Sequence, residues 1–233
     1  METLNKILTK GEKSPLIVAI DVEPKIGLKN LLSEAKEFVS GIKIGLPYLL
    51  THGMMYVKEM IKPFIDDYFF IADLKLADIG FVCKLLLEKT HLMGFDAVIS
   101  HGFIGLQDAL AEIKKKTDEL GLFLFIVAAM SHRGAEDILN KNIMKILEIS
   151  KILGIEGFVA PATMPNYIKV IRKELGDRVI IISPGVSTQG ASVGDALKAG
   201  ANFEIIGRKI ILSENPLESL RKINELYKDV RKR

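Results

Sequence analysis

Two charged residues that stand two positions apart are the first indication of chemistry in this sequence. Asp73 and Lys75 lie at the end of the apolar run Tyr68–Leu74. If that run is a strand, both side chains point to the same face, where a charge is costly unless it is paired. A salt bridge beneath an outer helix would also fit this spacing. Because Asp21 and Lys43 end up at the same rim of the predicted fold, we favour an inward-facing cluster of alternating charges.

A second candidate site follows the last two apolar runs of the chain. The seventh run leads into Ser183–Gly190, a glycine-bearing segment that offers backbone N–H groups, and the eighth ends at Gly207 and Arg208. Backbone N–H groups and the arginine fork both match phosphate oxygens. Either feature alone could be an ordinary turn or a surface arginine. Together, after consecutive strands, they predict a phosphate site.

The elements that must position these residues alternate along the chain. Nearly continuous apolar runs are typical of parallel strands buried on both faces, and the stretches between them have helical periodicity. Glycines such as Gly121 and Gly154 mark helix ends. We expect strands at Leu16–Ile20, Gly41–Ile44, Tyr68–Leu74, Phe95–Ile99, Leu122–Ala129, Gly157–Ala160, Arg178–Ile182 and Phe203–Ile206, and helices at Leu28–Val39, Tyr48–Ile61, Phe81–Met93, Leu106–Leu120, Glu136–Leu153, Pro165–Leu175, Ser192–Ala199 and Pro216–Val230.

Eight strands alternating with eight helices, without a linker, predict one α/β domain over residues 1–233, a closed (β/α)8 TIM barrel. Active sites of such barrels lie at the carboxyl ends of the strands, and phosphate sites often follow strands seven and eight. An open doubly wound sheet is the alternative. It usually carries a glycine-rich turn after its first strand, where this chain has Asp21–Pro24.

Composition excludes several classes of protein. The net charge is only +3 and tryptophan is absent, which argues against a nucleic-acid-binding surface. The single cysteine, Cys83, excludes an internal disulfide framework and fits a reducing compartment. Met1–Lys13 lacks the apolar segment of a signal peptide, and no apolar run approaches the roughly 20 residues of a membrane span. We therefore expect a cytoplasmic protein with neither nucleic-acid nor membrane partners.

With these residues identified, the sequence resembles the orotidine 5′-monophosphate decarboxylase family. The first of the matching segments fits the family's D-x-K-x-x-D-I signature, and the order and spacing of the whole set hold over nearly the whole chain. These segments are Asp73–Ile79, Val98–Gly102, Ala129–His132, Ser183–Val186, Gln189–Gly190 and Ile206–Arg208.

The resemblance implies a catalytic set for decarboxylation of orotidine 5′-monophosphate (OMP) to UMP and CO2, a step of pyrimidine biosynthesis that uses no metal and no organic cofactor. Lys75 would protonate the ring carbon that loses CO2, and Asp73 would lie against the substrate carboxylate. Lys43 would belong to the same charged array. Asp78 would come from the partner subunit, giving a homodimer with Asp78 and Ile79 shared across the interface.

The resemblance also implies a set of substrate contacts, and the loop over residues 184–194 would act as a lid. The contacts are Asp21 and Lys43 at the ribose hydroxyls, Ser131 at the pyrimidine with Ile79 and Pro184 nearby, Gln189, Gly207 and Arg208 at the phosphate, and in addition Asp73, Val82, Gly185 and Val186. The chain departs from many relatives at four positions, namely Gly80 for proline, Val82 for threonine, Ala191 for glycine and Lys209 for serine.

Three other functions are open to a chain with these motifs. Sister barrels, the 3-keto-L-gulonate-6-phosphate decarboxylases and hexulose-6-phosphate synthases, share D-x-K-x-x-D but resemble Mg²⁺ enzymes with an acidic ligand on strand two. This chain has Lys43 there, which would repel the metal. A non-catalytic phosphate-binding barrel is disfavoured by the complete charged array. Metal binding through the four histidines is disfavoured because they are far apart in the sequence.

Overall fold

Eight parallel strands pair in chain order, and β8 pairs back with β1, so that the sheet closes into a barrel. This computed structural model describes residues 2–187 and 190–231. The strands are β1 (Leu16–Ile20), β2 (Gly41–Gly45), β3 (Phe69–Leu76), β4 (Ala97–His101), β5 (Phe123–Val127), β6 (Gly157–Val159), β7 (Ile180–Pro184) and β8 (Phe203–Ile206).

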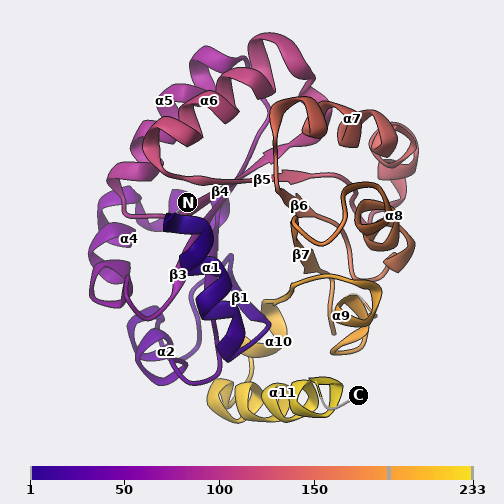
Figure 1. Cartoon of the computed structure of the whole chain (residues 1–233). Coiled ribbons are helices and arrows are strands. Elements are labelled where there is room, and N and C mark those ends of the chain that lie inside the picture. Colours follow the sequence, from indigo (N-terminus) through magenta and orange to yellow (C-terminus); the bar gives the residue numbers. More distant parts are fainter. Residues whose placement is uncertain (1, 188–189, 232–233) are drawn as a thin grey trace.

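Helices surround this barrel on all sides (Figure 1). The α-helices are α1 (Glu2–Lys13), α2 (Leu28–Glu34), α3 (Leu46–His52), α4 (Met54–Ile61), α5 (Gly80–Leu92), α6 (Ala111–Leu120), α7 (Ile143–Leu153), α8 (Pro165–Leu175), α9 (Asp195–Ala199), α10 (Arg208–Ile211) and α11 (Pro216–Arg231). Shorter 3₁₀ or π turns are η1 (Lys62–Phe64), η2 (Gly102–Ile104), η3 (Leu106–Leu110), η4 (Arg133–Glu136) and η5 (Asn140–Asn142).

The predicted TIM barrel is confirmed. Every residue of β1 and β2 is buried, as expected for strands covered by side chains inside the barrel and by helices outside it. Two predicted strands, Leu16–Ile20 and Phe203–Ile206, have the predicted bounds, and the other six differ by one to two residues at one or both ends. None of the helices in the described ranges is both long enough and apolar enough to cross a membrane.

Several predicted helices are shorter than their apolar pattern suggested. The expected helix Tyr48–Ile61 is two helices, because Gly53 adopts a left-handed φ of 81° between them. The expected helix Glu136–Leu153 begins only at Ile143, after two 3₁₀ turns. The expected helices Leu28–Val39, Leu106–Leu120 and Ser192–Ala199 lose their last five, first five and first three residues respectively from regular α-helix.

The sequence reading missed helix α1, which closes the amino-terminal end of the barrel (Figure 1). Thr3 Oγ1 donates a hydrogen bond of 2.6 Å to the carbonyl of Gly121, and Lys6 pairs with Asp96 at 2.7 Å. Ile7 of α1 is completely buried. Helix α1 thus covers the amino-terminal end of the barrel. The predicted site residues lie at the opposite, carboxyl-terminal end.

Candidate active site

A cavity of about 520 Å³ opens at the carboxyl-terminal ends of the strands. Its polar lining side chains come from the ends of five different strands or the loops after them, and apolar residues such as Ile99 and Ile205 line it as well. Of the predicted site residues it brings together Asp21, Lys43, Asp73, Lys75, Ser131, Pro184, Gly185, Val186, Gly207 and Arg208.

Three charged side chains form a continuous array in this cavity. Lys43 Nζ of β2 lies 2.8 Å from Asp73 Oδ2 of β3, and Lys75 Nζ lies 2.8 Å from Asp73 Oδ1. The side chains of Lys43 and Asp73 are each only 7% exposed, whereas Lys75 is 43% exposed. The aspartate is therefore held from both sides, and the outer ammonium remains accessible to a ligand in the cavity.

The backbone at Lys75 is unusual for a residue with a side chain. Its φ is 44°, in the left-handed region, and the pairing of β3 with β4 shifts register between Ala72 and Leu76. Such a bulge redirects side chains at the end of a strand. Left-handed backbone at a residue other than glycine is strained and is concentrated at functional sites. We attribute the inward direction of the Lys75 ammonium to this bulge as well as to strand alternation.

Asp21 extends the array across the mouth of the cavity. Its Oδ1 lies 3.2 Å from Lys43 Nζ, and its side chain is half exposed. The close approach depends on Gly45 at the end of β2, where an added Cβ would come within 1.9 Å of Asp21 Oδ1. The glycine therefore provides the space that this carboxylate occupies.

The buried pair of the array has shifted pKa values. Burial lowers the pKa of Lys43, but the carboxylates of Asp73 and Asp21 outweigh this effect and raise the pKa above 10.5. Burial raises the pKa of Asp73, but the ammonium groups of Lys43 and Lys75 outweigh it and hold the pKa below its ordinary value. Both groups are therefore charged near neutral pH.

The predicted phosphate residues that the structure describes line the cavity at the ends of β7 and β8. Pro184, Gly185 and Val186 line it after β7, and Gly207 and Arg208 line it after β8. The arginine is exposed and is the first residue of α10. Gln189 lies outside the described residues.

Three predicted site residues do not line the cavity of their own chain. Asp78 is exposed, and its Oδ1 accepts a hydrogen bond of 2.7 Å from the backbone N–H of Ile79. Ile79 is 62% exposed, and Val82 is half-buried on the first turn of α5. Next to them Phe81 and Leu85, four residues apart on one face of α5, are also exposed.

One support of the site was missed from sequence. Asn140 is buried, and its side chain accepts the N–H of Met130 and donates to the carbonyl of Met130, both at 3.0 Å. It also donates to Glu136 Oε1 at 2.6 Å, and Tyr167 donates to the same carboxylate. This network fixes the backbone beside Ser131. The only sequence signal for it was an asparagine within a stretch predicted to be helical.

Neither metal ligation nor a second hollow provides a better candidate site. Among the residues that the structure describes, no group of three histidine, cysteine, aspartate or glutamate side chains is arranged to hold a metal ion. A larger hollow of about 820 Å³ lies at the other end of the barrel, beside α1. The charged residues that line it, such as Lys6 and Asp96, are not buried. We therefore take the smaller cavity, with its buried charges, as the active site.

Comparison with known proteins agrees with this choice. A model of the family described as "Orotidine 5'-phosphate decarboxylase / HUMPS family" matches residues 14–223. The chain belongs to this family. A curated orotidine 5′-phosphate decarboxylase from Methanococcoides burtonii is 37% identical over 212 residues, which cover 91% of this chain and 96% of the relative. One from Aeropyrum pernix is 37% identical, with 90% and 87% covered.

Solved structures agree with the curated relatives. The crystal structure of orotidine 5′-monophosphate decarboxylase from Sulfolobus solfataricus matches with a TM-score of 0.86 at 35% identity and covers 94% of this chain and 99% of its own. That from Methanocaldococcus jannaschii, complexed with inhibitor BMP, matches with a TM-score of 0.81 at 32% identity, with 91% and 97% covered. Within the family, the chain therefore stands among the orotidine 5′-phosphate decarboxylases, which are carboxy-lyases.

Proposed function

We propose that the chain, an orotidine 5′-phosphate decarboxylase, converts OMP to UMP and CO2 without a metal or organic cofactor, with Lys75 as the proton donor. The observation that carries this assignment is the Lys43–Asp73–Lys75 array at the mouth of the cavity. The alternative sugar-phosphate enzymes would need an acidic metal ligand on β2, and the residue there is the buried ammonium of Lys43.

The array suits a reaction in which negative charge appears on carbon. When the bond from the ring carbon to the carboxylate breaks, its electron pair stays on the ring carbon and CO2 leaves. The Lys75 ammonium then transfers its proton to that carbon. Two unit charges about 4 Å apart interact by roughly 4 kcal/mol at an effective dielectric constant of 20. Because Lys75 is already oriented, most of its stabilisation is gained as the carbanion forms.

Asp73 and the distal groups have separate roles in this proposal. Asp73 orients both ammonium groups and lies against the substrate carboxylate, and Asp21 with Lys43 binds the ribose hydroxyls. Ser131 binds the pyrimidine. Gly207 and Arg208 bind the phosphate, so binding energy from the non-reacting end of the substrate holds the ring against Lys75.

The test is an ultraviolet assay of OMP decarboxylation in the presence of EDTA, with wild type and Lys75→Ala. We expect the wild type to be insensitive to EDTA. The variant should lose about 10²- to 10⁴-fold in kcat/KM, the range for removing a general acid or a preorganised charge. Its thermal unfolding should remain cooperative because Lys75 is partly exposed. Retention of a tenth of the activity would overturn the role of Lys75, and inhibition by EDTA would favour the metal-dependent alternative.

We further propose that the active unit is a homodimer in which Asp78 completes the array of the partner subunit. Two observations support this. Asp78 lies outside the cavity of its own chain, and the adjacent Ile79, Phe81 and Leu85 expose apolar surface of the kind found at interfaces. Asp78 and Ile79 would then be shared between the two subunits across a two-fold interface.

Mixing two inactive variants tests this arrangement. Lys75→Ala and Asp78→Asn, unfolded and refolded together in equal amounts, give half heterodimers, and each heterodimer has one intact site of two. We expect recovery of about a quarter of wild-type activity. Each variant refolded alone is the control. If heterodimers form, as shown by tagged subunits, and activity does not return, Asp78 does not act across the interface.

A further inference from the structure

Three charged side chains are buried in the described part of the chain, namely Lys43, Asp73 and Glu204. The first two belong to the array of the active site. Glu204 is 0% exposed and has no part in the chemistry proposed above. It lies on β8 between Phe203 and Ile205, and Ile205 lines the active-site cavity. Because successive side chains on a strand alternate, the Glu204 carboxylate points out of the barrel, toward the helical layer.

The partners of this carboxylate come from two helical elements. The backbone N–H of Gly194 donates to its two oxygens at 3.0 and 2.9 Å, and the N–H of Ala196 donates to Oε1 at 2.9 Å. The hydroxyl of Tyr227, on α11, donates to Oε2 at 2.9 Å. Tyr227 is itself 1% exposed. Glu204 therefore ties the start of α9 and the carboxyl-terminal half of α11 to the barrel wall.

The groups that stabilise the Glu204 carboxylate are neutral donors. Burial raises the pKa of Glu204, and the N–H groups of Gly194 and Ala196 and the hydroxyl of Tyr227 only partly oppose this effect. A buried carboxylate without a cation costs stability, so its retention calls for a reason other than packing.

That reason lies in what Gly194 follows along the chain. Val186, which lines the cavity, pairs with Ala191 in an isolated bridge, and the N–H of Ser187 donates to the carbonyl of Ala191 at 2.7 Å. Ala191 is three residues before Gly194. The backbone at Val186 and Ser187 is thus paired with Ala191. Ala191 is in turn connected, through two residues of the chain, to Gly194, whose N–H is bonded to Glu204.

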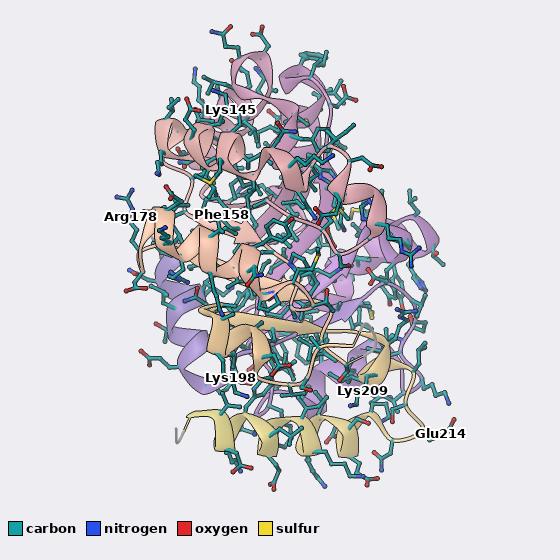
Figure 2. The ribbon with its side chains drawn as sticks, turned by 90° about the vertical axis from the view of Figure 1, so that its right-hand side faces the viewer. Lys145, Phe158, Arg178, Lys198, Lys209 and Glu214 are labelled. Atoms are coloured by element: carbon teal, nitrogen blue, oxygen red, sulfur yellow. The ribbon has the colours of Figure 1, made fainter. Side chains whose placement is uncertain are left out.

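Helix α11 encloses this anchor from outside. Figure 2 shows α11 along one edge of the molecule, on the side where Lys198 of α9 and Lys209 of α10 are labelled. Gly194 has a φ of 92°, and a Cβ at that position would lie 2.5 Å from Val230 of α11. The backbone of the segment therefore packs directly on α11, leaving little room for it to shift.

We propose that Glu204 is a positioning residue for the substrate phosphate. Its carboxylate fixes Gly194 and Ala196, and through Ala191 it sets the position of the Gly185–Val186 backbone at the phosphate end of the cavity. This inference rests on the proposed function, since it assigns the anchored segment to the phosphate of OMP. It requires that loss of the carboxylate affect catalysis through the phosphate alone.

The experiment compares two substrates in wild type and Glu204→Gln. OMP carries the phosphate, and the nucleoside orotidine lacks it but has the same reacting carbon. Small misplacements of a binding group cost up to about 100-fold in rate. We expect kcat/KM for OMP to fall roughly 10- to 100-fold, while kcat/KM for orotidine stays within about twofold of wild type. The ratio of the two constants is a readout that a general loss of stability would not change.

A matched control exists at the other end of the barrel. Asp96 is a carboxylate that accepts the backbone N–H of Phe70 at 2.8 Å and pairs with Lys6, far from the phosphate segment. Asp96→Asn should weaken folding without changing the ratio between the two substrates. Tyr227→Phe removes one donor to Glu204 and should shift the ratio in the same direction as Glu204→Gln, but less.

The outcomes separate the two proposals. If wild type does not decarboxylate OMP, the proposed function fails. If wild type is active and the variants lose activity on both substrates equally, or on neither, the positioning role of Glu204 is overturned. Should Glu204→Gln fail to fold, Tyr227→Phe decides by the same ratio, because it leaves the contacts of Glu204 with Gly194 and Ala196 in place.

Discussion

The barrel buries carboxylates in two places and stabilises them in two different ways. Inside the mouth, Asp73 lies between the ammonium groups of Lys43 and Lys75. Outside the wall, Glu204 is surrounded by two backbone N–H groups and a tyrosine hydroxyl. The inner carboxylate is matched by full charges and the outer one by dipoles. Both carboxylates are buried, but different groups offset the cost of burying their charge. As a result the pKa of Asp73 is lowered and the pKa of Glu204 is raised.

The difference matches what each region does. Charges can act on a reacting molecule over several ångströms, so the inner array can stabilise a carbanion that forms beside it. Hydrogen bonds to backbone N–H groups act only at contact and fix the path of the chain. The charges around Asp73 therefore act on the substrate electrostatically, and the hydrogen bonds around Glu204 fix the position of the backbone.

The largest effect is expected from removing the inner cation. Lys43→Met leaves Asp73 buried with one partner in place of two, and breaking a buried ion pair costs about 3–5 kcal/mol. Urea unfolding would measure the loss. Replacing the pair together, as Lys43→Met with Asp73→Leu, should recover most of it because no unmatched charge is then buried. A cost below about 1 kcal/mol for the single variant would show that the array is not held by charge.

A smaller loss is expected at the outer carboxylate. Glu204→Gln keeps one acceptor oxygen but places an amide N–H₂ group among donors, at a cost of about 2 kcal/mol for the hydrogen bonds lost. The same urea titration measures it, with Asp96→Asn as the reference for a carboxylate that has a cation. If Glu204→Gln cost as much as Lys43→Met, the contrast between charge and dipole compensation would be wrong.

The most subtle test is the pH dependence of stability, in which the two carboxylates should act in opposite directions. The pKa of Asp73 is below its ordinary value of 3.8, so its contribution is complete above about pH 4 and is lost as the pH falls through the folded-state pKa. The pKa of Glu204 is above its ordinary value of 4.5, so its ionisation weakens the fold as the pH rises from 4.5 through the folded-state pKa.

Unfolding free energies at a series of pH values would reveal these signs. The loss of unfolding free energy in Asp73→Asn relative to wild type should widen as the pH rises toward 4 and then level off. The loss in Glu204→Gln relative to wild type should narrow above pH 4.5. Deficits that change in the same direction would contradict the assignment of opposite pKa shifts.

Most of the barrel could be predicted from sequence because strands buried on both faces have few residue types available to them. β1 and β8 have the predicted bounds: Leu16–Ile20 is a continuous apolar run, and Phe203–Ile206 is apolar apart from Glu204. The helices were less predictable at their ends. The amphipathic pattern continues through Gly53, and only the left-handed backbone there separates α3 from α4.

The site was predictable where it follows from strand order. Residues at the carboxyl ends of parallel strands meet at one rim, which is why Asp21, Lys43 and Asp73 could be grouped. Glu204 and Asn140 could not, because most of their partners are backbone groups of other segments and a single polar residue in an apolar stretch gives no sign of its direction. The bulge before Leu76 was equally hidden.

The left-handed backbone at Lys75 has a consequence for assembly of the molecule. A strained torsion persists only where its surroundings hold it, and here β3 pairs with β2 up to Asp73 and with β4 at Leu76, on either side of Lys75. A barrel in which β3 had not yet docked on both sides would let Lys75 relax to an ordinary extended backbone, and the ammonium would turn aside. Catalytic competence thus requires that β3 has paired with both of its neighbours, so turnover during refolding would report the docking of β3.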